Sequence, residues 1–326
     1  MFLNFPNYKI FNILKMKKLT IILSLVAAFA ATAYAQDEAI LSHYLFNPTL
    51  INPGATGFSE NHNVFAHFRN GWTGFPDAPK TYAISYNGPM NNNLGLGAMV
   101  FSENIAQLNR IRGQLSYSFR YKLGDDFKMG IGLSTQIQQT RLLSQTNNTL
   151  LNVNDLVVQR MMDGVKTFDA SIGVFGSLSD KFYFGVSLPG LVSARLSKVA
   201  GSKADSNTVF STFQIIAGYK YVLGDITLEP VLMVGQVRTA PFQADLSLRA
   251  SFLNEVFMAG LVYKAYDKGA VGVLLGTKFN GFRLIYSYDY SLQKFQEYNS
   301  GGHEFTVGYE FSRSDKKFDR QKKYRN

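Results

Sequence analysis

The feature that most constrains this chain is a long alternation of side chains over residues 110–139. From 110 to 123, apolar residues take turns with charged or hydroxylic ones, and the alternation resumes at 127 after the turn Gly124-Asp125-Asp126. Successive side chains of a strand point to opposite faces, so this stretch predicts a hairpin with one apolar and one polar surface. Each arm is about 13 residues long, whereas strands of soluble proteins average about 5–6.

A long hairpin of this kind is typical of a transmembrane β-barrel, where the apolar face meets lipid and the polar face lines a wet lumen. Taken alone, it also fits a soluble antiparallel sheet with one solvated face. Fourteen alternating segments follow residue 61, an even number, as single-chain bacterial barrels have. The segments are 62–69, 79–87, 94–102, 109–123, 127–140, 167–178, 182–188, 209–223, 226–236, 242–253, 256–264, 271–279, 282–290 and 303–312. The sequence therefore predicts an all-β protein, a transmembrane antiparallel β-barrel of about 14 strands with an irregular N-terminal arm.

The connections between these segments alternate between short and long, which a soluble sandwich would have no reason to do. Short turns are expected at 88–93, 124–126, 179–181, 224–225, 254–255 and 280–281, and longer connections at 70–78, 141–166, 189–208 and 291–302. Bacterial barrels have short periplasmic turns and longer extracellular loops. The pattern therefore predicts that both chain termini lie in the periplasm.

Charged residues gather on one face of the predicted strands and aromatic residues on the other. Mixed charges can be accommodated only where water or opposite charges solvate them, so we assign them to the lumen. They are Arg110, Arg112, Arg120, Lys122, Asp169, Glu229, Asp245, Arg249, Arg283, Asp289, Glu304 and Glu310. The opposite face carries Tyr117, Phe119, Tyr121, Tyr219, Tyr221, Tyr286, Tyr288 and Tyr290, as aromatic girdles require.

Residues 1–35 have the pattern of a secretory signal peptide. Lysines at 15, 17 and 18 precede an apolar run over 19–31, and Ala33-Tyr34-Ala35 fits the small-x-small cleavage pattern. Met16 is an alternative start to Met1. A single membrane helix is the competing interpretation, but the run is shorter than the ~20 apolar residues that a span needs.

The excess of positive charge in this chain is concentrated at its two ends. The sequence has 33 Lys and Arg against 23 Asp and Glu, and residues 1–35 contain four of the lysines and no acid. The segment 313–326 holds seven basic and two acidic residues, which leaves 22 against 21 for 36–312. This distribution, without a recognisable RNA or DNA module, gives no support to nucleic-acid binding. The absence of cysteine argues against a small extracellular domain held by disulfides.

The chain thus divides into a signal peptide (1–35), an N-terminal arm (36–61), an outer-membrane β-barrel (62–312) and a basic periplasmic tail (313–326). The arm contains Asn47-Pro48 and Asn52-Pro53, and proline forces the residue before it into an extended or turned conformation. We expect the arm to lie at the inner end of the barrel or partly inside it as a plug.

Residue patterns for catalysis or metal binding are thin. The four histidines, His43, His62, His67 and His303, form no HExxH motif and have no carboxylate at ligand spacing, so we expect no metal site and no cofactor. Ser187 lacks the GxSxG spacing of a serine hydrolase. The sequence therefore predicts a protein that is not an enzyme.

Two stretches exceed what a bare barrel needs. The first is the arm segment with Tyr44 to Pro48 and Ile51 to Pro53, and the second is the connection over 69–81, which contains the only tryptophan. On physics alone, they could be a structural plug and a constriction loop. Both resemble motifs of the PorP/SprF family of outer-membrane proteins from the type IX secretion and gliding-motility apparatus. The arm matches the family's Tyr-Met-Phe-Asn-Pro, with Leu45 in the place of Met, and its Ile-Asn-Pro, and the connection matches Arg-x-x-Trp-x-Gly-Phe followed by Ala-Pro-x-Thr.

The resemblance implies a non-enzymatic outer-membrane component that supports export or surface anchoring of cargo with a C-terminal sorting domain. It implies three kinds of partner: secreted surface protein, periplasmic and outer-membrane components of the secretion machinery, and membrane lipid. A passive or substrate-specific porin is the alternative. An outer-membrane enzyme such as a phospholipase needs a Ser/His pair that the sequence does not show. The expected partner-binding residues are Tyr44, Phe46, Asn47, Pro48, Asn52, Pro53, Arg69, Trp72, Gly74, Phe75 and Pro79.

Overall fold

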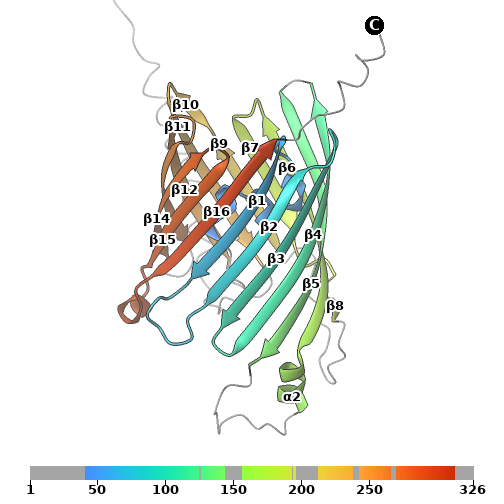
Figure 1. The fold of residues 1–326 in the computed structure, drawn as a ribbon, viewed down its shortest axis with the longest axis vertical. Coiled ribbons are helices and arrows are strands. Elements are labelled where there is room, and N and C mark those ends of the chain that lie inside the picture. Colours follow the sequence, from blue (N-terminus) through green and yellow to red (C-terminus); the bar gives the residue numbers. More distant parts are fainter. Residues whose placement is uncertain are drawn as a thin grey trace, which may run out of the picture.

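The strands close into a single antiparallel barrel (Figure 1). The computed structural model describes residues 41–124, 126–143, 156–192, 194–195, 212–237, 242–265 and 269–312. The strands are β1 (Asn61–Asn70), β2 (Lys80–Pro89), β3 (Leu94–Ile105), β4 (Leu108–Leu123), β5 (Phe127–Leu142), β6 (Val165–Leu178), β7 (Phe182–Leu188), β8 (Ala194–Arg195), β9 (Phe213–Tyr219), β10 (Tyr221–Leu223), β11 (Ile226–Gln236), β12 (Gln243–Phe252), β13 (Phe257–Ala265), β14 (Ala270–Phe279), β15 (Phe282–Ser291) and β16 (Gly302–Ser312).

The wall has fourteen strands, as the sequence predicts. Each strand pairs with its neighbour in the chain, and β1 closes the ring by pairing with β16 along its whole length. The predicted segment 209–223 appears as β9 and β10, which are separated only at Lys220, and residues 209–211 lie outside the described part. The two-residue strand β8 pairs with β6 beyond the end of β7 and adds no strand to the ring.

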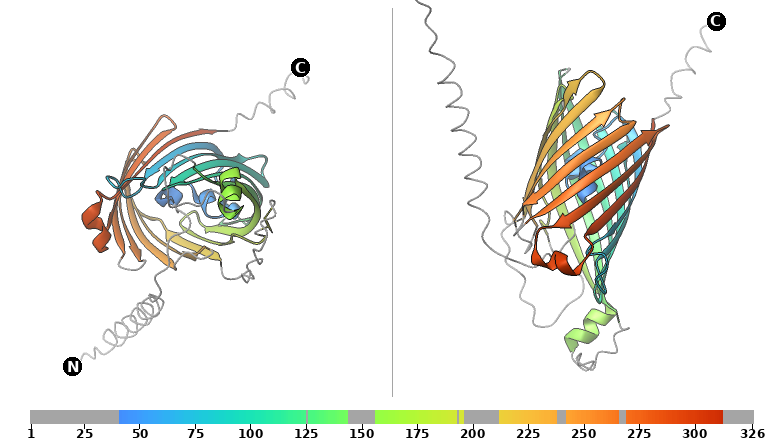
Figure 2. Two further views of the ribbon diagram at one scale, coloured as in Figure 1. Left: turned by 90° about the horizontal axis from the view of Figure 1, so that it is seen from below. Right: turned by 90° about the vertical axis from the view of Figure 1, so that its left-hand side faces the viewer.

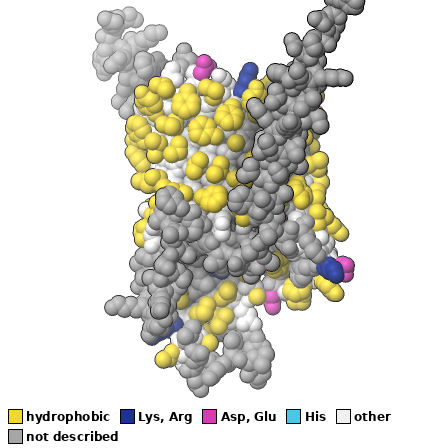
Figure 3. Space-filling view, turned by 180° about the vertical axis from the view of Figure 1, so that it is seen from behind, with side chains coloured by type: hydrophobic (Ala, Val, Ile, Leu, Met, Phe, Trp, Pro, Cys, Tyr) yellow, Lys and Arg dark blue, Asp and Glu magenta, His cyan; other side chains and the backbone are white. Residues whose placement is uncertain are grey.

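The two faces of each strand differ in burial, as the side-chain alternation predicts. On β4, Leu115 faces outward with 64% of its surface exposed, whereas Ser118 faces inward and is fully buried. The outer surface is largely apolar, and hydrophobic side chains cover much of the part that is visible from behind in Figure 3. Among the described residues, none of the helices is long and apolar enough to cross a membrane.

The ends of the barrel are unequal. Short turns and the C-terminal end of β16 lie at one end, and the helix α2 (Leu156–Asp163) and the 3₁₀ turn η5 (Lys294–Tyr298) lie at the other (Figure 1). One connection at the loop end is also short, because β3 and β4 are joined by only Ala106 and Gln107. The predicted signal peptide, the basic tail and most of the two longest loops lie outside the described residues.

Residues 41–58 lie inside the barrel, where the end view in Figure 2 shows the arm filling part of the lumen. They form three 3₁₀ turns, η1 (Ser42–Leu45), η2 (Pro48–Leu50) and η3 (Pro53–Ala55). Proline begins η2 and η3, where its missing N–H costs no hydrogen bond. The Asn52 side chain caps η3 by accepting a hydrogen bond from Gly54 N at 2.8 Å. The arm then leaves at the short-turn end and enters β1.

Candidate functional site: the arm and the lumen wall

The first turn of the arm is fixed by a carboxylate from the last strand. Glu304 accepts hydrogen bonds from the backbone N–H groups of Ser42 and His43, at 2.9 and 3.1 Å. The same carboxylate binds the Arg69 guanidinium at 2.9 Å. Two orphan donors of a short turn and one cation thus converge on a single buried anion, an arrangement in which each hydrogen bond is charge-assisted.

A second ion pair extends this network to the neighbouring strands. Lys264 Nζ lies 2.7 Å from Asp289 Oδ2 and donates to Ser42 Oγ at 2.7 Å. Arg69 Nη2 lies 3.2 Å from Asp289 Oδ2 and so joins the two carboxylates. Two cations balance two anions, as a buried ionic cluster requires. Glu304, Arg69, Asp289, Lys264 and Ser42 are called the ionic cluster below.

His43 is fully buried between the ionic cluster and hydroxyl groups of the wall. Its Nδ1 lies 2.6 Å from Thr306 Oγ1, and its Nε2 lies 3.0 Å from Ser287 Oγ. Burial lowers the pKa of the His43 imidazole below its usual 6.5, although Glu304 opposes this shift. A neutral ring with one donor and one acceptor nitrogen matches two hydroxyl partners, which can serve in either role.

Three groups in this region could in principle hold a metal ion. Ligand atoms of His43, His67 and Glu304 lie within 4.8 Å of one another. Both ring nitrogens of His43 already have hydroxyl partners, and Arg69 holds the carboxylate. A divalent cation would add two positive charges beside Arg69 and Lys264. The chemistry of the site therefore favours the hydrogen-bonded network over a metal centre.

The aromatic side chains of the arm pack on two different sets of wall residues. Tyr44 packs with Phe175, Ile216 and Met233, and its hydroxyl donates to Asp245 Oδ2 at 3.4 Å. Phe46 packs on a separate set of wall residues, Met258, Leu274 and Ile285. The guanidinium groups of Arg249 and Arg283 lie 4.7 and 5.9 Å from the centre of the Phe46 ring. Cation–π contacts of this kind are strongest when water is excluded, so they hold the ring firmly.

The arm backbone approaches the wall closely at glycines. A Cβ atom at Gly132 of β5 would lie 2.1 Å from the Pro53 carbonyl oxygen, and one at Gly95 of β3 would lie 2.1 Å from that of Thr56. No other residue fits at either position without moving the arm. These glycines therefore shape a track on the lumen wall for residues 53–57.

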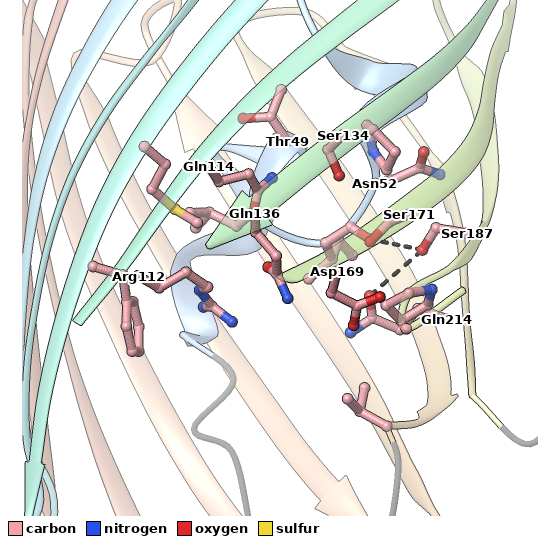
Figure 4. A pocket seen from close by; sticks show the side chains of 18 of the residues that line it. Thr49, Asn52, Arg112, Gln114, Ser134, Gln136, Asp169, Ser171, Ser187 and Gln214 are labelled. Carbon is pink, nitrogen blue, oxygen red and sulfur yellow. Dashed lines mark hydrogen bonds between the residues drawn. The ribbon is translucent and has the colours of Figure 1, made fainter. Parts of the chain in front are cut away.

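The arm separates two vestibules. The one toward the loop end, shown in Figure 4, has a volume of about 100 Å³ and is lined by polar and apolar side chains of arm and wall. In it, Ser187 Oγ donates to the Ile51 carbonyl at 2.7 Å, and the Arg112 guanidinium lies 4.4 Å from the centre of the Phe101 ring. The vestibule toward the short turns measures about 350 Å³ and contains charges of both signs, among them Lys128, Glu255 and Glu310.

The predicted partner-binding residues separate into two groups. Tyr44, Phe46, Asn47, Asn52 and Pro53 are buried in the lumen. The half-buried Pro48 lies beside them, and Arg69 joins the ionic cluster. Trp72, Gly74, Phe75 and Pro79 lie instead in the β1–β2 loop at the rim. Their function as binding residues stays a prediction.

The β1–β2 loop is attached to a neighbouring loop rather than folded onto the arm. Thr73 N donates to Gly301 O at 2.8 Å, and Ser300 N donates to Thr73 O at 2.6 Å. Trp72 and Phe75 remain 41% and 43% exposed. The loop thus presents two aromatic side chains at the rim.

Sequence reasoning missed the importance of His43, Lys264 and Thr306. Asp289 and Glu304 were assigned to the lumen from the alternation, but their contact with the arm has no local signal. The hydrogen bond from His43 N to Glu304 joins residues 261 positions apart. The alternation could have shown that Thr306 faces inward, but not that it meets His43.

The fold and the apolar outer surface define this protein as an outer-membrane β-barrel. Among solved structures, the CymD monoaromatic hydrocarbon channel matches with a TM-score of 0.51 and 12% identity over 84% of this chain and 94% of that one. The toluene transporter TodX of P. putida matches with a TM-score of 0.46 and 10% identity over 82% of this chain and 95% of that one. The KdgM porin matches with a TM-score of 0.38 and 9% identity over 77% of this chain and 99% of that one. The CymD likeness shows the fold alone. No curated protein matches the sequence.

Comparison of the sequence with models of protein families identifies the family. The model of the type IX secretion system membrane protein PorP/SprF matches residues 33–309. The chain belongs to this family, as the motifs of the arm and the β1–β2 loop indicate.

Proposed function

We propose that this barrel is a non-enzymatic component of the type IX secretion apparatus that supports export or surface anchoring of cargo with C-terminal sorting domains. The family match over residues 33–309 carries the proposal. The arm supports it, because a lumen crossed by a buried segment is better suited to a scaffold than to free diffusion. On this proposal, periplasmic and outer-membrane parts of the machinery are the partners.

The exposed aromatic residues of the β1–β2 loop, at the loop end of the barrel, are the best candidates for contact with the secreted cargo or with an outer-membrane partner. Buried arm residues cannot reach a partner without leaving the lumen, whereas Trp72 and Phe75 already lie at the rim. Aromatic side chains contribute much of the energy of protein interfaces. On this proposal, the arm stabilises the barrel, and the β1–β2 loop binds the partner.

The experiment is deletion of the gene in its native host, followed by mass spectrometry of surface and secreted proteins. We expect a few large proteins with C-terminal sorting domains to leave the surface and a plasmid copy to restore them. Trp72→Ala/Phe75→Ala should fail to restore them, whereas Tyr298→Ala, at a 71% exposed aromatic of the same end, should succeed. An unchanged surface proteome with reduced uptake of small solutes would overturn the proposal.

A porin is the second candidate, and the charged vestibules are the observation that favours it. Planar-bilayer conductance separates the two functions. The proposed scaffold should conduct far less than an open barrel of this size, since fourteen strands without a plug leave room for a channel. Stable, large single-channel steps from the full-length protein would favour the porin.

We also propose that both termini lie in the periplasm. The position of Ser312 at the short-turn end supports this for the C-terminal strand. Since the chain has no cysteine, Ser312→Cys and Tyr298→Cys can be labelled singly in whole cells. An impermeant maleimide should label residue 298 in intact cells and residue 312 only after the outer membrane is opened; the reverse result would invert the orientation.

A further inference from the structure

A hollow interrupts the lipid-facing surface of β2 to β6. Five outward-facing residues form one register row across these strands: Ile84, Val100, Gly113, Ile137 and Phe168. A Cβ atom at Gly113 would meet nothing within 4 Å. The missing side chain leaves an apolar depression of about 510 Å³ between its larger neighbours.

Basic and amide side chains border this hollow on its loop-end side. Gln139 and Arg141 follow Ile137 on the outward face of β5, and Lys166 precedes Phe168 on β6 and pairs with Gln139. Arg141 packs against Gly164, whose N–H donates to the Arg160 carbonyl at the end of α2. Asp163, at the end of α2, is exposed. Figure 1 shows α2 beyond the ends of β5 and β6.

The basic residues lie at the height of the outer membrane interface. Ten positions separate Tyr121, near the short turns, from Ile111, which pairs with Gln139. At about 3.3 Å per residue and a strand tilt of about 40°, this stretch spans about 25 Å, the height of the apolar band of outer-membrane barrels. In the orientation proposed above, with the loop end outside, Lys166 and Arg141 therefore meet the headgroups of the outer leaflet.

We propose that this surface is a binding site for the phosphorylated glycolipid of the outer leaflet, lipid A. Arg141 and Lys166 bind its phosphates, and one acyl chain lies in the hollow at Gly113. A guanidinium binds phosphate through two parallel hydrogen bonds. Charge complementarity at this interface, directly beside an apolar depression, matches a lipid with an anionic sugar head better than it matches a protein.

The test is native mass spectrometry of the delipidated full-length protein in detergent, titrated with diphosphoryl lipid A. Arg141→Gln/Lys166→Gln should weaken binding about tenfold or more, because each cation near an anionic lipid surface contributes several-fold. The matched control is Lys181→Gln/Lys294→Gln, which removes two exposed lysines outside the site. This control should bind like the wild type, and an unchanged melting temperature of each variant shows that the barrel is folded.

A second variant tests the hollow independently. Gly113→Leu should fill it without a clash and reduce lipid A binding several-fold while the melting temperature holds or rises. Equal binding by the wild type and Arg141→Gln/Lys166→Gln would overturn the site. Equally tight binding of phosphatidylglycerol, or displacement of lipid A by inorganic phosphate, would overturn its assignment to a glycolipid.

Discussion

At the residue scale, the ionic cluster is the part of the lumen whose loss should destabilise the folded barrel most. Glu304 satisfies two backbone N–H groups of the arm and one guanidinium, all in a buried place. Removing one partner of such a pair leaves uncompensated charge and unpaired donors. The strength of the cluster therefore lies in its completeness rather than in any single contact.

Glu304→Ala should destabilise the folded barrel by roughly 3–5 kcal/mol, the usual cost of breaking a buried ion pair. The free energy of unfolding from urea titration in micelles measures it. Glu60→Ala provides the control, because the Glu60 side chain is 76% exposed and its contact with Lys122 is at the surface. If both substitutions have the same small effect, the arm is not held by the cluster.

His43 should make the docking of the arm sensitive to mild acid. Its folded-state pKa is depressed, so the unfolded state binds a proton more readily, and stability falls as the pH drops below about 6.5. Urea titrations between pH 7.5 and 5 should show this loss, and His43→Gln should flatten it. If the free energy of unfolding falls with pH equally in the wild type and in His43→Gln, groups other than His43 cause the loss. The charged or titratable groups near His43 are Glu304, Arg69, Asp289, Lys264 and His67.

At the element scale, the strands could be predicted from sequence because each one carries its own signal. The alternation of Leu115 and Ser116 fixes which face is wet, and turns such as Asn280-Gly281 fix where a strand ends. The arm has no such period. Its prolines predict turns, but its path depends on wall residues far away in the chain, such as Gly132 and Glu304. Local patterns cannot report those contacts.

The glycine track gives a prediction about how the arm and β5 fit together. Gly132→Leu places a side chain where Pro53 O lies and should displace η3, at a cost of about 1–3 kcal/mol. Hydrogen exchange of residues 50–58 should accelerate while the strands stay protected. Gly113→Leu on the outer face of β4 is the matched control, since its Cβ meets open space. Equal exchange in the two variants would show that the track does not hold the arm.

At the scale of the whole molecule, the arm and the wall form one unit. The arm contacts β16 and β15 through His43, β2 through Asn47, and β6 through Asn52, so it braces opposite sides of the barrel. The fourteen strands close into a ring without the arm, but without the arm the interior of the barrel would not be filled. This arrangement predicts that the arm stays docked in the lumen while the protein performs its proposed function in secretion.

A disulfide between the arm and the wall tests this expectation directly. A Cβ atom at Gly97 would lie 3.1 Å from Thr56 Cγ2, a spacing compatible with a disulfide in the variant Thr56→Cys/Gly97→Cys. The chain has no other cysteine to compete, and the periplasm is oxidising. Cells with the cross-linked barrel should display the same surface proteins as the wild type, and the purified barrel should keep its low conductance. Loss of surface cargo in the oxidised variant, with recovery on reduction and no loss in Thr56→Cys alone, would mean that the arm must leave the lumen for secretion.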